Sequence, residues 1–356
     1  MIIPLPSFFG KRSGRGVALI VVMIAVFVLS VLAGAFAYSM KVETKLATNA
    51  NNDADLDWIG RSGVEYARWI LAQEKCPYDS LNQKWAGGPG AACETNGPLA
   101  EAVLTDFHVG NGVFSLKITD LERKINVNTA DAPTLEQVMR VIGADADQSA
   151  SIVDSIRDWV DPDDNTHVNG AESDFYQGLT PPYVAKNGPI DDISELLLIK
   201  GIRDNPEIYS AEYADVQRVD RFGNEMPKPP PPPAYLVDIF TPFSTGKINI
   251  NTASRAILAM IPGMDDAIAD QIIRVRSGPD GADGTDDDTP FASVGELASV
   301  GLPQQAQPQL NRYCTTRSST FQVEVDAQIG SSKQTYYAII GRNNPRDIQV
   351  LSFYPK

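Results

Sequence analysis

The N-terminal part of the chain reads KRSGRG over residues 11–16 and VALIVVMIAVFVLSVLAGAFAYSM over residues 17–40. The second segment holds 24 residues without a charged side chain. As a helix it rises about 36 Å, enough to cross a bilayer with some tilt. Three positive charges precede this segment, and no charge follows until Lys41. This asymmetry predicts that the basic end stays in the cytoplasm while the rest of the chain crosses the membrane.

Three kinds of N-terminal segment fit this pattern. A cleaved secretory signal would use a small-residue site such as residues 33–37, although the apolar core of such a signal is normally shorter. A plain signal anchor explains the hydropathy equally well. The third is a prepilin-type leader over residues 1–16, cut on the cytoplasmic side between Gly16 and Val17. In that case the apolar segment becomes the N-terminus of the mature chain.

The helical pattern continues beyond the apolar segment without a proline. We therefore expect one helix from about Val17 to about Glu74, with a transmembrane half over residues 17–40 and an amphipathic half that packs on a globular domain. The sequence Cys76-Pro77 ends this helix, because proline cannot continue it. The apolar side chains of the second half recur at helical spacing: Leu46, Leu56, Ile59, Val64, Ala67, Ile70 and Leu71.

Strands are expected on both sides of the middle of the chain. Residues 107–109 and 113–118 flank a Gly-Asn-Gly turn and predict a β-hairpin. Three alternating segments near the C-terminus, residues 320–329, 335–342 and 347–354, predict an antiparallel meander. Together they indicate an α+β fold with one antiparallel-sheet domain, over residues 41–123 and 313–356, that is interrupted by a large insertion.

The insertion, residues 124–312, contains an internal repeat. KINVNTA at residues 124–130 recurs as KININTA at residues 247–253, and a glycine turn separates two helical patterns after each copy. We expect the Asn or Thr of Asn-Thr-Ala to cap the helix that follows. The insertion is thus predicted to be mostly helical, like a helix-hairpin-helix or SAM-like region. Its two related halves are residues 124–226 and 247–312, joined by a stiff Pro-rich spacer at residues 227–233. The helical patterns cover residues 134–141, 148–160, 256–260 and 267–276.

The composition argues against several classes of protein. The chain has 30 Lys and Arg against 45 Asp and Glu, a net charge of −15, which disfavours a protein built to bind a polyanion. Two His and three Cys leave few ligands for a zinc site. The sequence lacks the G-x-S-x-G elbow, the phosphate-binding loop and the H-E-x-x-H motif. We therefore expect a protein that is not an enzyme.

Two acidic loops could hold a hard cation. In the first loop, Asp161, Asp163, Asn165 and Glu172 fall at positions 1, 3, 5 and 12, the spacing of an EF-hand loop, although Thr166 stands where that motif has glycine. Crowded carboxylates repel one another unless they are solvated or bridged by a cation, and a solvated acidic surface is the alternative. The sequence predicts Ca²⁺ in at least one of the two loops. The candidate ligands are Asp158, Asp161, Asp163, Asn165, Glu172 and Asp174 in the first loop, and Asp280, Asp283, Asp286, Asp287 and Asp288 in the second.

The three cysteines allow three pairings. Cys76 and Cys93 flank one Gly- and Pro-rich loop, whereas Cys314 is remote in the sequence. If most of the chain lies outside the cytoplasmic membrane, the compartment favours disulfides. A Cys76–Cys93 bridge is the favoured pairing, with Cys314 buried or free.

The glycine turns also raise a nucleic-acid-binding alternative. Helix-hairpin-helix modules that bind DNA present backbone N–H groups to a phosphate, with Lys or Arg nearby. In this chain Asp145 and Asp147 follow the first turn, and Asp265 and Asp266 follow the second. Because carboxylates at these places would repel a phosphate, a membrane-anchored DNA-binding protein is the second choice and no nucleic-acid partner is expected.

Taken together, these motifs resemble the minor pseudopilin K family of the Gram-negative type II secretion system. The resemblance runs from about Arg15 to the C-terminus. The motifs that carry it are GVALI at residues 16–20, the two Asn-x-Asn-Thr-Ala repeats, DWVDPDD at 158–164, GAE at 170–172, PY at 182–183 and ISEL at 193–196.

The resemblance implies a structural subunit that initiates or caps the tip of a periplasmic pseudopilus used to export folded proteins. It also implies cleavage by the prepilin peptidase after Gly16, methylation of the new Val17 amine, and bound calcium. The implied partners are minor pseudopilins I and J, other pseudopilins and the inner-membrane secretion platform. The implied location is the inner membrane, as a single-pass protein with its bulk in the periplasm. Most pilins have Glu at the fifth residue of the processed chain, where this chain has Val21, and an apolar residue suits a subunit that enters the fibre first.

Overall fold

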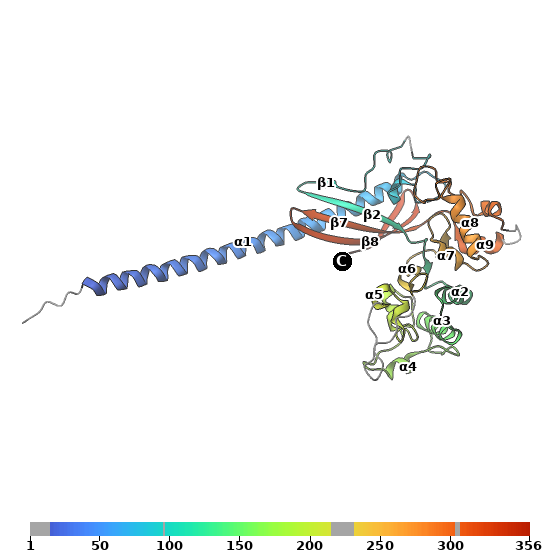
Figure 1. Cartoon of the computed structure of the whole chain (residues 1–356), viewed down its shortest axis with the longest axis horizontal. Coiled ribbons are helices and arrows are strands. Elements are labelled where there is room, and N and C mark those ends of the chain that lie inside the picture. Colours follow the sequence, from blue (N-terminus) through green and yellow to red (C-terminus); the bar gives the residue numbers. More distant parts are fainter. Residues whose placement is uncertain (1–14, 95–96, 215–230, 303–306) are drawn as a thin grey trace, which may run out of the picture.

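A single long helix, α1 (Arg15–Gln73, 59 residues), begins the described part of the chain. The computed structural model describes residues 15–94, 97–214, 231–302 and 307–356. The apolar half of α1 projects away from the rest of the molecule (Figure 1), and its side chains from Leu19 to Met40 are exposed. This helix is long and apolar enough to cross a membrane. The prediction of one continuous helix is confirmed, and its exposed half is consistent with a single-pass anchor.

A five-stranded antiparallel sheet covers one side of the second half of α1 (Figure 1). Its strand order is β1-β2-β7-β8-β9, so the hairpin before the insertion and the meander after it form one sheet. The pairing of β2 with β7 sets Leu116 opposite Val325 and Asp120 opposite Phe321. The predicted hairpin and meander are therefore confirmed. The strands are β1 (Phe107–Val109), β2 (Gly112–Asp120), β7 (Thr320–Ile329), β8 (Ser332–Asn344) and β9 (Asp347–Pro355).

Two glycines let α1 approach the sheet closely. A Cβ atom on Gly60 would lie 2.5 Å from the ring of Tyr336, and one on Gly63 would lie 2.5 Å from Cγ1 of Val325. Both neighbours are buried in the core between helix and sheet. Of the predicted apolar stripe, Leu46 is exposed, whereas this core contains Leu56, Ile59, Val64, Ala67, Ile70 and Leu71.

Replacing Gly63 with Ala is expected to destabilise the sheet domain. Alanine favours a helix over glycine by about 1 kcal/mol, but overpacking a filled core costs about 1–3 kcal/mol. Because a contact of 2.5 Å forces neighbouring atoms to move, the cost lies in the upper part of this range. We therefore expect a net loss of about 1–2 kcal/mol in the free energy of unfolding of the full chain in detergent. Gly34→Ala on the same helix is the control, because nothing lies within 4 Å of its Cβ position. A Gly63→Ala protein as stable as the parent would contradict this packing.

The insertion consists of short helices and two small parallel strand pairs around its own hydrophobic core. Each half begins with a strand of the repeat, followed by a helix, a glycine turn and a second helix. In both turns the glycine, Gly143 or Gly263, adopts a left-handed conformation. The described helices are α2 (Ala132–Ile142), α3 (Ala146–Val160), α4 (Ser173–Gln177), α5 (Ala211–Ala214), α6 (Leu236–Ile239), α7 (Arg255–Ala259), α8 (Asp266–Arg276) and α9 (Gln307–Tyr313). The short 3₁₀ helices of the insertion are η2 (Ile193–Leu198), η3 (Pro206–Ile208) and η4 (Val294–Val300), and a further one, η1 (Lys84–Ala86), lies in the loop after α1.

The two halves repeat the same hydrogen bonds as well as the same sequence. Asn128 accepts a hydrogen bond from the backbone N–H of Ile190 and donates one to its carbonyl. Asn251 makes the equivalent pair with Phe291. The first asparagine of each repeat, Asn126 or Asn249, accepts from the backbone N–H two residues later. The Asn-x-Asn-Thr-Ala segment therefore fastens each half to its own later loop.

The capping prediction for this repeat is wrong. The helices α2 and α7 are capped by Asp131 and Ser254, whose side chains accept from Thr134 N–H and Ile257 N–H. The asparagines are unavailable for capping because their side chains hold the turn and the distant loop. The caps therefore lie just after the Asn-Thr-Ala tripeptide.

The pairing of the short strands also moves the boundaries of the two halves. Strand β3 (Ile125–Asn126) pairs with β4 (Phe240–Thr241), and β5 (Ile248–Asn249) pairs with β6 (Cys314–Thr315). The first half thus extends to Thr241 and the second to Thr315, beyond the predicted ends at 226 and 312. Residues 227–230 of the predicted Pro-rich spacer lie outside the described residues. Because β4 follows the spacer and belongs to the first half, the spacer does not separate the halves.

Candidate functional site

The first acidic loop follows helix α3, whose last turn carries the fully buried Asp158. The Asp158 carboxylate accepts from the backbone N–H of His167 at 3.1 and 3.3 Å and contacts the Nδ1 atom of the same residue. The loop passes so close that a Cβ atom on Gly170 would lie 1.8 Å from Oδ2 of Asp158. Only glycine fits there, which explains the glycine in the GAE segment at residues 170–172.

Carboxylates converge around Asp158. One potential ligand atom from each of Asp158, Asp161 and His167 lies within 4.8 Å of the other two. Glu172 is only 3% exposed, and neither of its carboxylate oxygens has a hydrogen-bond partner in the described part of the chain. The same holds for the buried Oδ1 atom of Asp161. The carboxyl groups of Asp158, Asp161 and Glu172 form the oxygen-rich centre of the loop.

Burial and mutual repulsion disfavour the charged forms of these groups. Burial, followed by the charges of Asp158, Asp161, Asp164 and Asp163, raises the pKa of Glu172 to about 7. Burial and the neighbouring Asp163 and Asp158 likewise raise the pKa of Asp161. A hard cation bound by several oxygens would remove this repulsion and supply partners for the unpaired oxygens. The residues present therefore fit Ca²⁺ or a similar hard cation.

The remaining predicted residues of this loop lie around the centre. Asp163 accepts from the backbone N–H of Asn165 at 2.9 Å, and the side chains of these two residues are also hydrogen-bonded. Asp174 lies exposed on α4. Two further residues of this loop, His167 and Asp164, were not predicted as ligands. The Asp164 carboxylate accepts hydrogen bonds from the side chains of Ser173 and Asn187. The signal for His167 was its place in the acidic loop, but its contact with Asp158 depends on how the loop turns back.

The second acidic loop is organised around a buried arginine. Arg276 of α8 pairs with Asp283 through two contacts, Nη2–Oδ2 at 2.6 Å and Nε–Oδ1 at 2.9 Å. Its Nη1 atom also donates to the carbonyls of Ile250 and Ala253 in the second repeat. A buried guanidinium thus supplies positive charge directly to a carboxylate of the second loop.

Most other carboxylates of the second loop also have protein donors. Asp280 accepts from Ala282 N–H, Asp287 from Asp280 N–H, and Asp288 from Gly284 N–H. Asp286 is exposed. Among the described residues, no three carboxylates of this loop have oxygen atoms that all lie within 4.8 Å of one another. Calcium binding by Asp280, Asp283, Asp286, Asp287 and Asp288 stays a prediction that this geometry does not strengthen.

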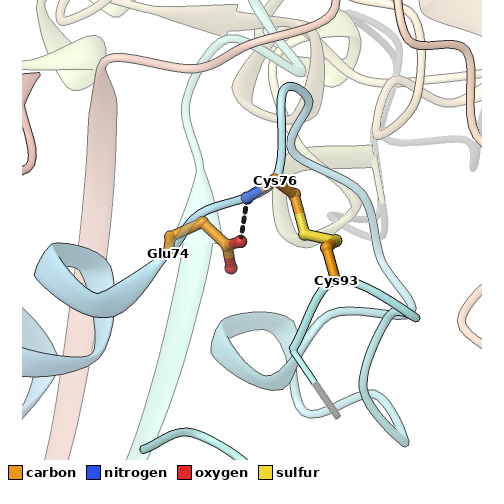
Figure 2. A group of neighbouring side chains, drawn as sticks. All are labelled: Glu74, Cys76 and Cys93. Atoms are coloured by element: carbon orange, nitrogen blue, oxygen red, sulfur yellow. Dashed lines mark hydrogen bonds between the residues drawn. A yellow bond between two sulfur atoms is a disulfide. The ribbon is translucent and has the colours of Figure 1, made fainter. Parts of the chain in front are cut away.

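A disulfide joins Cys76 to Cys93 and closes the loop after α1 (Figure 2). Glu74 lies beside it, and Oε1 of Glu74 accepts from the backbone N–H of Cys76 at 2.9 Å. Because both sulfur atoms are committed to the disulfide, this acidic and sulfur-containing cluster is not a metal site. Cys314 is a buried free thiol in the core of the insertion.

The glycine turns offer no phosphate site in the two repeats. The side chain of Asp145 caps α3 by accepting from Gln148 N–H, and Asp265 caps α8 by accepting from Ile268 N–H. Carboxylates therefore occupy the N–H groups that a phosphate would need. This arrangement argues against nucleic-acid binding through these turns.

A buried polar junction connects the insertion to the sheet domain. Asp120, at the end of β2, accepts from Asn249 and Thr252 of the insertion and from Ser318. Burial raises the pKa of Asp120, and burial together with the Asp120 charge raises the pKa of Glu122 to about 8. We use the name junction for Asp79, Asp120, Glu122, Asn249, Thr252, Ser318 and Arg342.

The basic member of the junction is Arg342 on β8. Its guanidinium pairs with Asp79, and both side chains are only 1% exposed. Asp79 lies in the disulfide-closed loop and also accepts from Ser318 N–H at 2.7 Å. The carbonyl of Asp79 accepts from Asn249 at 3.1 Å. The junction therefore fixes the loop, the sheet and the second repeat to one another.

Comparisons with known proteins agree on one family. A family model described as type II secretion system, protein K, matches residues 114–211. The type II secretion system protein K of Pseudomonas aeruginosa is 23% identical, with 96% of this chain and 93% of that protein covered. The protein of the same description from Klebsiella pneumoniae is 26% identical over 53% of this chain and 58% of its own length.

A solved structure has the same fold. It is a chain of the GspK–GspI–GspJ complex from the type 2 secretion system of enterotoxigenic Escherichia coli. The TM-score is 0.61 at 17% identity, and the match covers 87% of this chain and 99% of that chain. Three findings indicate the same family: a protein K relative matched over nearly its whole length, the family model, and the shared fold. The chain belongs to the type II secretion system protein K family.

Proposed function

We propose that this chain is a minor pseudopilin, a structural subunit that initiates or caps the tip of a periplasmic pseudopilus for the export of folded proteins. The observation that carries this proposal is the architecture of the subunit. An exposed apolar helix leads into a helix packed on an antiparallel sheet, and a large insertion is fastened to that sheet. The role is structural rather than enzymatic.

The position of the insertion supports a place at the tip. Its helices lie toward the end of the sheet domain that is remote from the projecting half of α1 (Figure 1). If that half lies in the membrane or in the fibre core, the insertion covers the opposite end of the subunit. A bulky cover there would hinder the packing of another subunit above it. The apolar Val21 fits the same role, because a charged residue without a partner is costly in lipid.

The proposed partners are minor pseudopilins I and J. Support comes from the fold that this chain shares with a chain of the GspK–GspI–GspJ complex. Contacts with other pseudopilins and with the inner-membrane secretion platform follow from the same role. We also propose cleavage after Gly16, methylation of Val17, and an inner-membrane location with most of the chain in the periplasm.

Co-purification from native membranes tests this function. The full chain, carrying an affinity tag at its C-terminus, is expected to retain the I and J pseudopilins of its own secretion system after detergent extraction. The exposed apolar half of α1 is the surface expected to keep neighbouring subunits together. A tagged integral membrane protein of unrelated function is the control for detergent carry-over. Recovery of this chain without I and J would contradict the proposal.

We further propose that the first acidic loop binds a structural Ca²⁺. Asp158, Asp161 and Glu172 are the proposed central ligands. Ligand atoms of Asp158 and Asp161 converge, the charges of both act on Glu172, and Asp161 and Glu172 have oxygens without a partner among the described residues. The charges of Asp163 and Asp164 act on the same centre. When bound, the ion supplies positive charge that ties the end of α3 to the start of α4.

A further inference from the structure

The disulfide-closed loop joins an exposed cysteine to a buried one. Cys93 is exposed, whereas Cys76 is fully buried. A pocket of about 250 Å³ lies against the exposed side and is lined by Lys75, Cys93, Glu94 and Pro98, among others. A thiol compound could therefore reach Cys93 but not Cys76.

A carboxyl group stands next to the buried sulfur. One carboxylate oxygen of Glu74 and both sulfur atoms lie within 4.8 Å of one another (Figure 2). Glu74 is only 2% exposed, and its Oε2 atom has no hydrogen-bond partner among the described residues. The Oε1 atom is fixed by the backbone N–H of Cys76, which holds the carboxyl group at the disulfide.

The surroundings of Glu74 favour a proton on it near neutral pH. Burial raises the pKa of Glu74 to about 7, although the hydrogen bond from Cys76 N–H opposes this rise. A carboxyl group with this pKa can accept or return a proton at physiological pH. The other titratable and charged groups near it are Tyr78, Asp79 and Glu94, with Lys75, Arg317 and Arg342 lining a second pocket beside it.

We propose that Cys76–Cys93 is an exchangeable disulfide, which thiol compounds enter and leave at Cys93 while Glu74 takes and returns the proton of Cys76. In the closing direction, Cys93 first carries a mixed disulfide with a thiol compound. The Cys76 thiol gives its proton to Glu74, and its sulfur attacks Cys93. The Cys76–Cys93 bond forms, and the thiol compound leaves as a thiolate. Opening is the reverse, with a thiolate attacking Cys93 and Glu74 protonating Cys76.

The entry point is tested with oxidised glutathione as the probe. The full chain is purified in detergent as Cys76→Ser and Cys93→Ser variants, and glutathionylation is followed by peptide mass spectrometry, which separates Cys314 from the other two sites. We expect Cys93 in the first variant to react at least about 10-fold faster than Cys76 in the second. Equal reactivity, or faster reaction of Cys76, would overturn the proposal.

The role of Glu74 is tested by the rate of ring closure. The full chain is reduced with dithiothreitol and mixed with oxidised glutathione, and closure of the glutathionylated intermediate is timed between pH 5.5 and 9. Glu74→Gln keeps the acceptor for Cys76 N–H but cannot take the proton. We expect closure to slow about 10- to 100-fold at pH 7, with the difference shrinking at high pH, where the thiol ionises unaided. Glu74→Asp should restore part of the rate.

The control is Glu101→Gln, an exposed glutamate after the same loop, which should close at the parent rate. A Glu74→Gln protein that closes at the parent rate at pH 7 would overturn the role of Glu74. If Glu74→Gln does not fold, the dependence of the closure rate on pH in the parent chain tests the role of Glu74 instead. Its closure rate should rise with the ionisation of a group near pH 7, and a profile that rises only with thiol ionisation would refute the proposal.

Discussion

Replacing Arg342 with Met is expected to lower the free energy of unfolding by about 3–5 kcal/mol. Arg342 and Asp79 are both buried, and the substitution leaves the Asp79 carboxylate without its cation. Asp120 and Glu122 lie in the same junction and add to the acidic charge that remains around Asp79. Since domains are stable by only about 5–15 kcal/mol, this is a large share of the total.

Urea unfolding of the full chain in detergent measures this effect. Trp85 is buried and packs edge-on against Phe321, whose ring lies 4.8 Å from the Arg342 guanidinium carbon. Trp85 is therefore the one of the four tryptophans whose contribution to the fluorescence is expected to respond to the junction. Arg346→Met in the exposed turn after β8 is the matched control and should change stability little.

A double substitution separates the ion pair from its surroundings. Asp79→Asn combined with Arg342→Met should cost less than the sum of the two single changes, because neither charge is then left alone. Strict additivity, or a loss below about 1 kcal/mol for Arg342→Met, would show that the junction does not depend on this pair.

Removing calcium is expected to have the second largest effect. If the first acidic loop binds Ca²⁺, saturation at 100 times the dissociation constant stabilises the folded chain by about 2.7 kcal/mol. A chelator should remove this contribution and lower the melting temperature. Glu172→Gln should abolish the dependence on calcium, because it replaces a buried carboxylate whose oxygens have no hydrogen-bond partner among the residues that the structure describes.

Two controls locate the effect within the chain. Asp174→Asn alters an exposed carboxylate of the same loop, and Asp286→Asn an exposed one of the second loop. Both variants should keep the full calcium-dependent shift. Melting temperatures of the parent chain that are the same with calcium and with chelator would end the calcium proposal. Loss of the shift in Asp286→Asn alone would move the site to the second loop.

Local sequence patterns predicted most of the elements. The long helix, the hairpin and the meander follow from hydrophobic period and turn residues within a few positions, and the structure confirms them. The repeat predicted two related halves because its motif recurs almost unchanged. The sequence does not reveal the strands that pair with the repeats, because β4 and β6 are only two residues long and lie many residues away from β3 and β5.

The details of the site depend on contacts that the sequence does not reveal. Nothing in the order of residues indicates that Arg276 turns back to Asp283 and to the carbonyls of the second repeat. The two acidic loops therefore look alike in sequence but differ in structure. Likewise, the two asparagines of each repeat suit a helix cap by residue type, yet long-range partners at Ile190 and Phe291 engage the second of them.

The central claim is that this chain enters a pilus-like fibre as a processed pseudopilin. The most direct test is mass spectrometry of the mature N-terminus on protein extracted from its native membranes. Cleavage after Gly16 with a methylated Val17 is the predicted result. An intact Met1 would contradict the account and leave an ordinary signal-anchored protein, and a start near Tyr38 would contradict it equally by making the chain a secreted one.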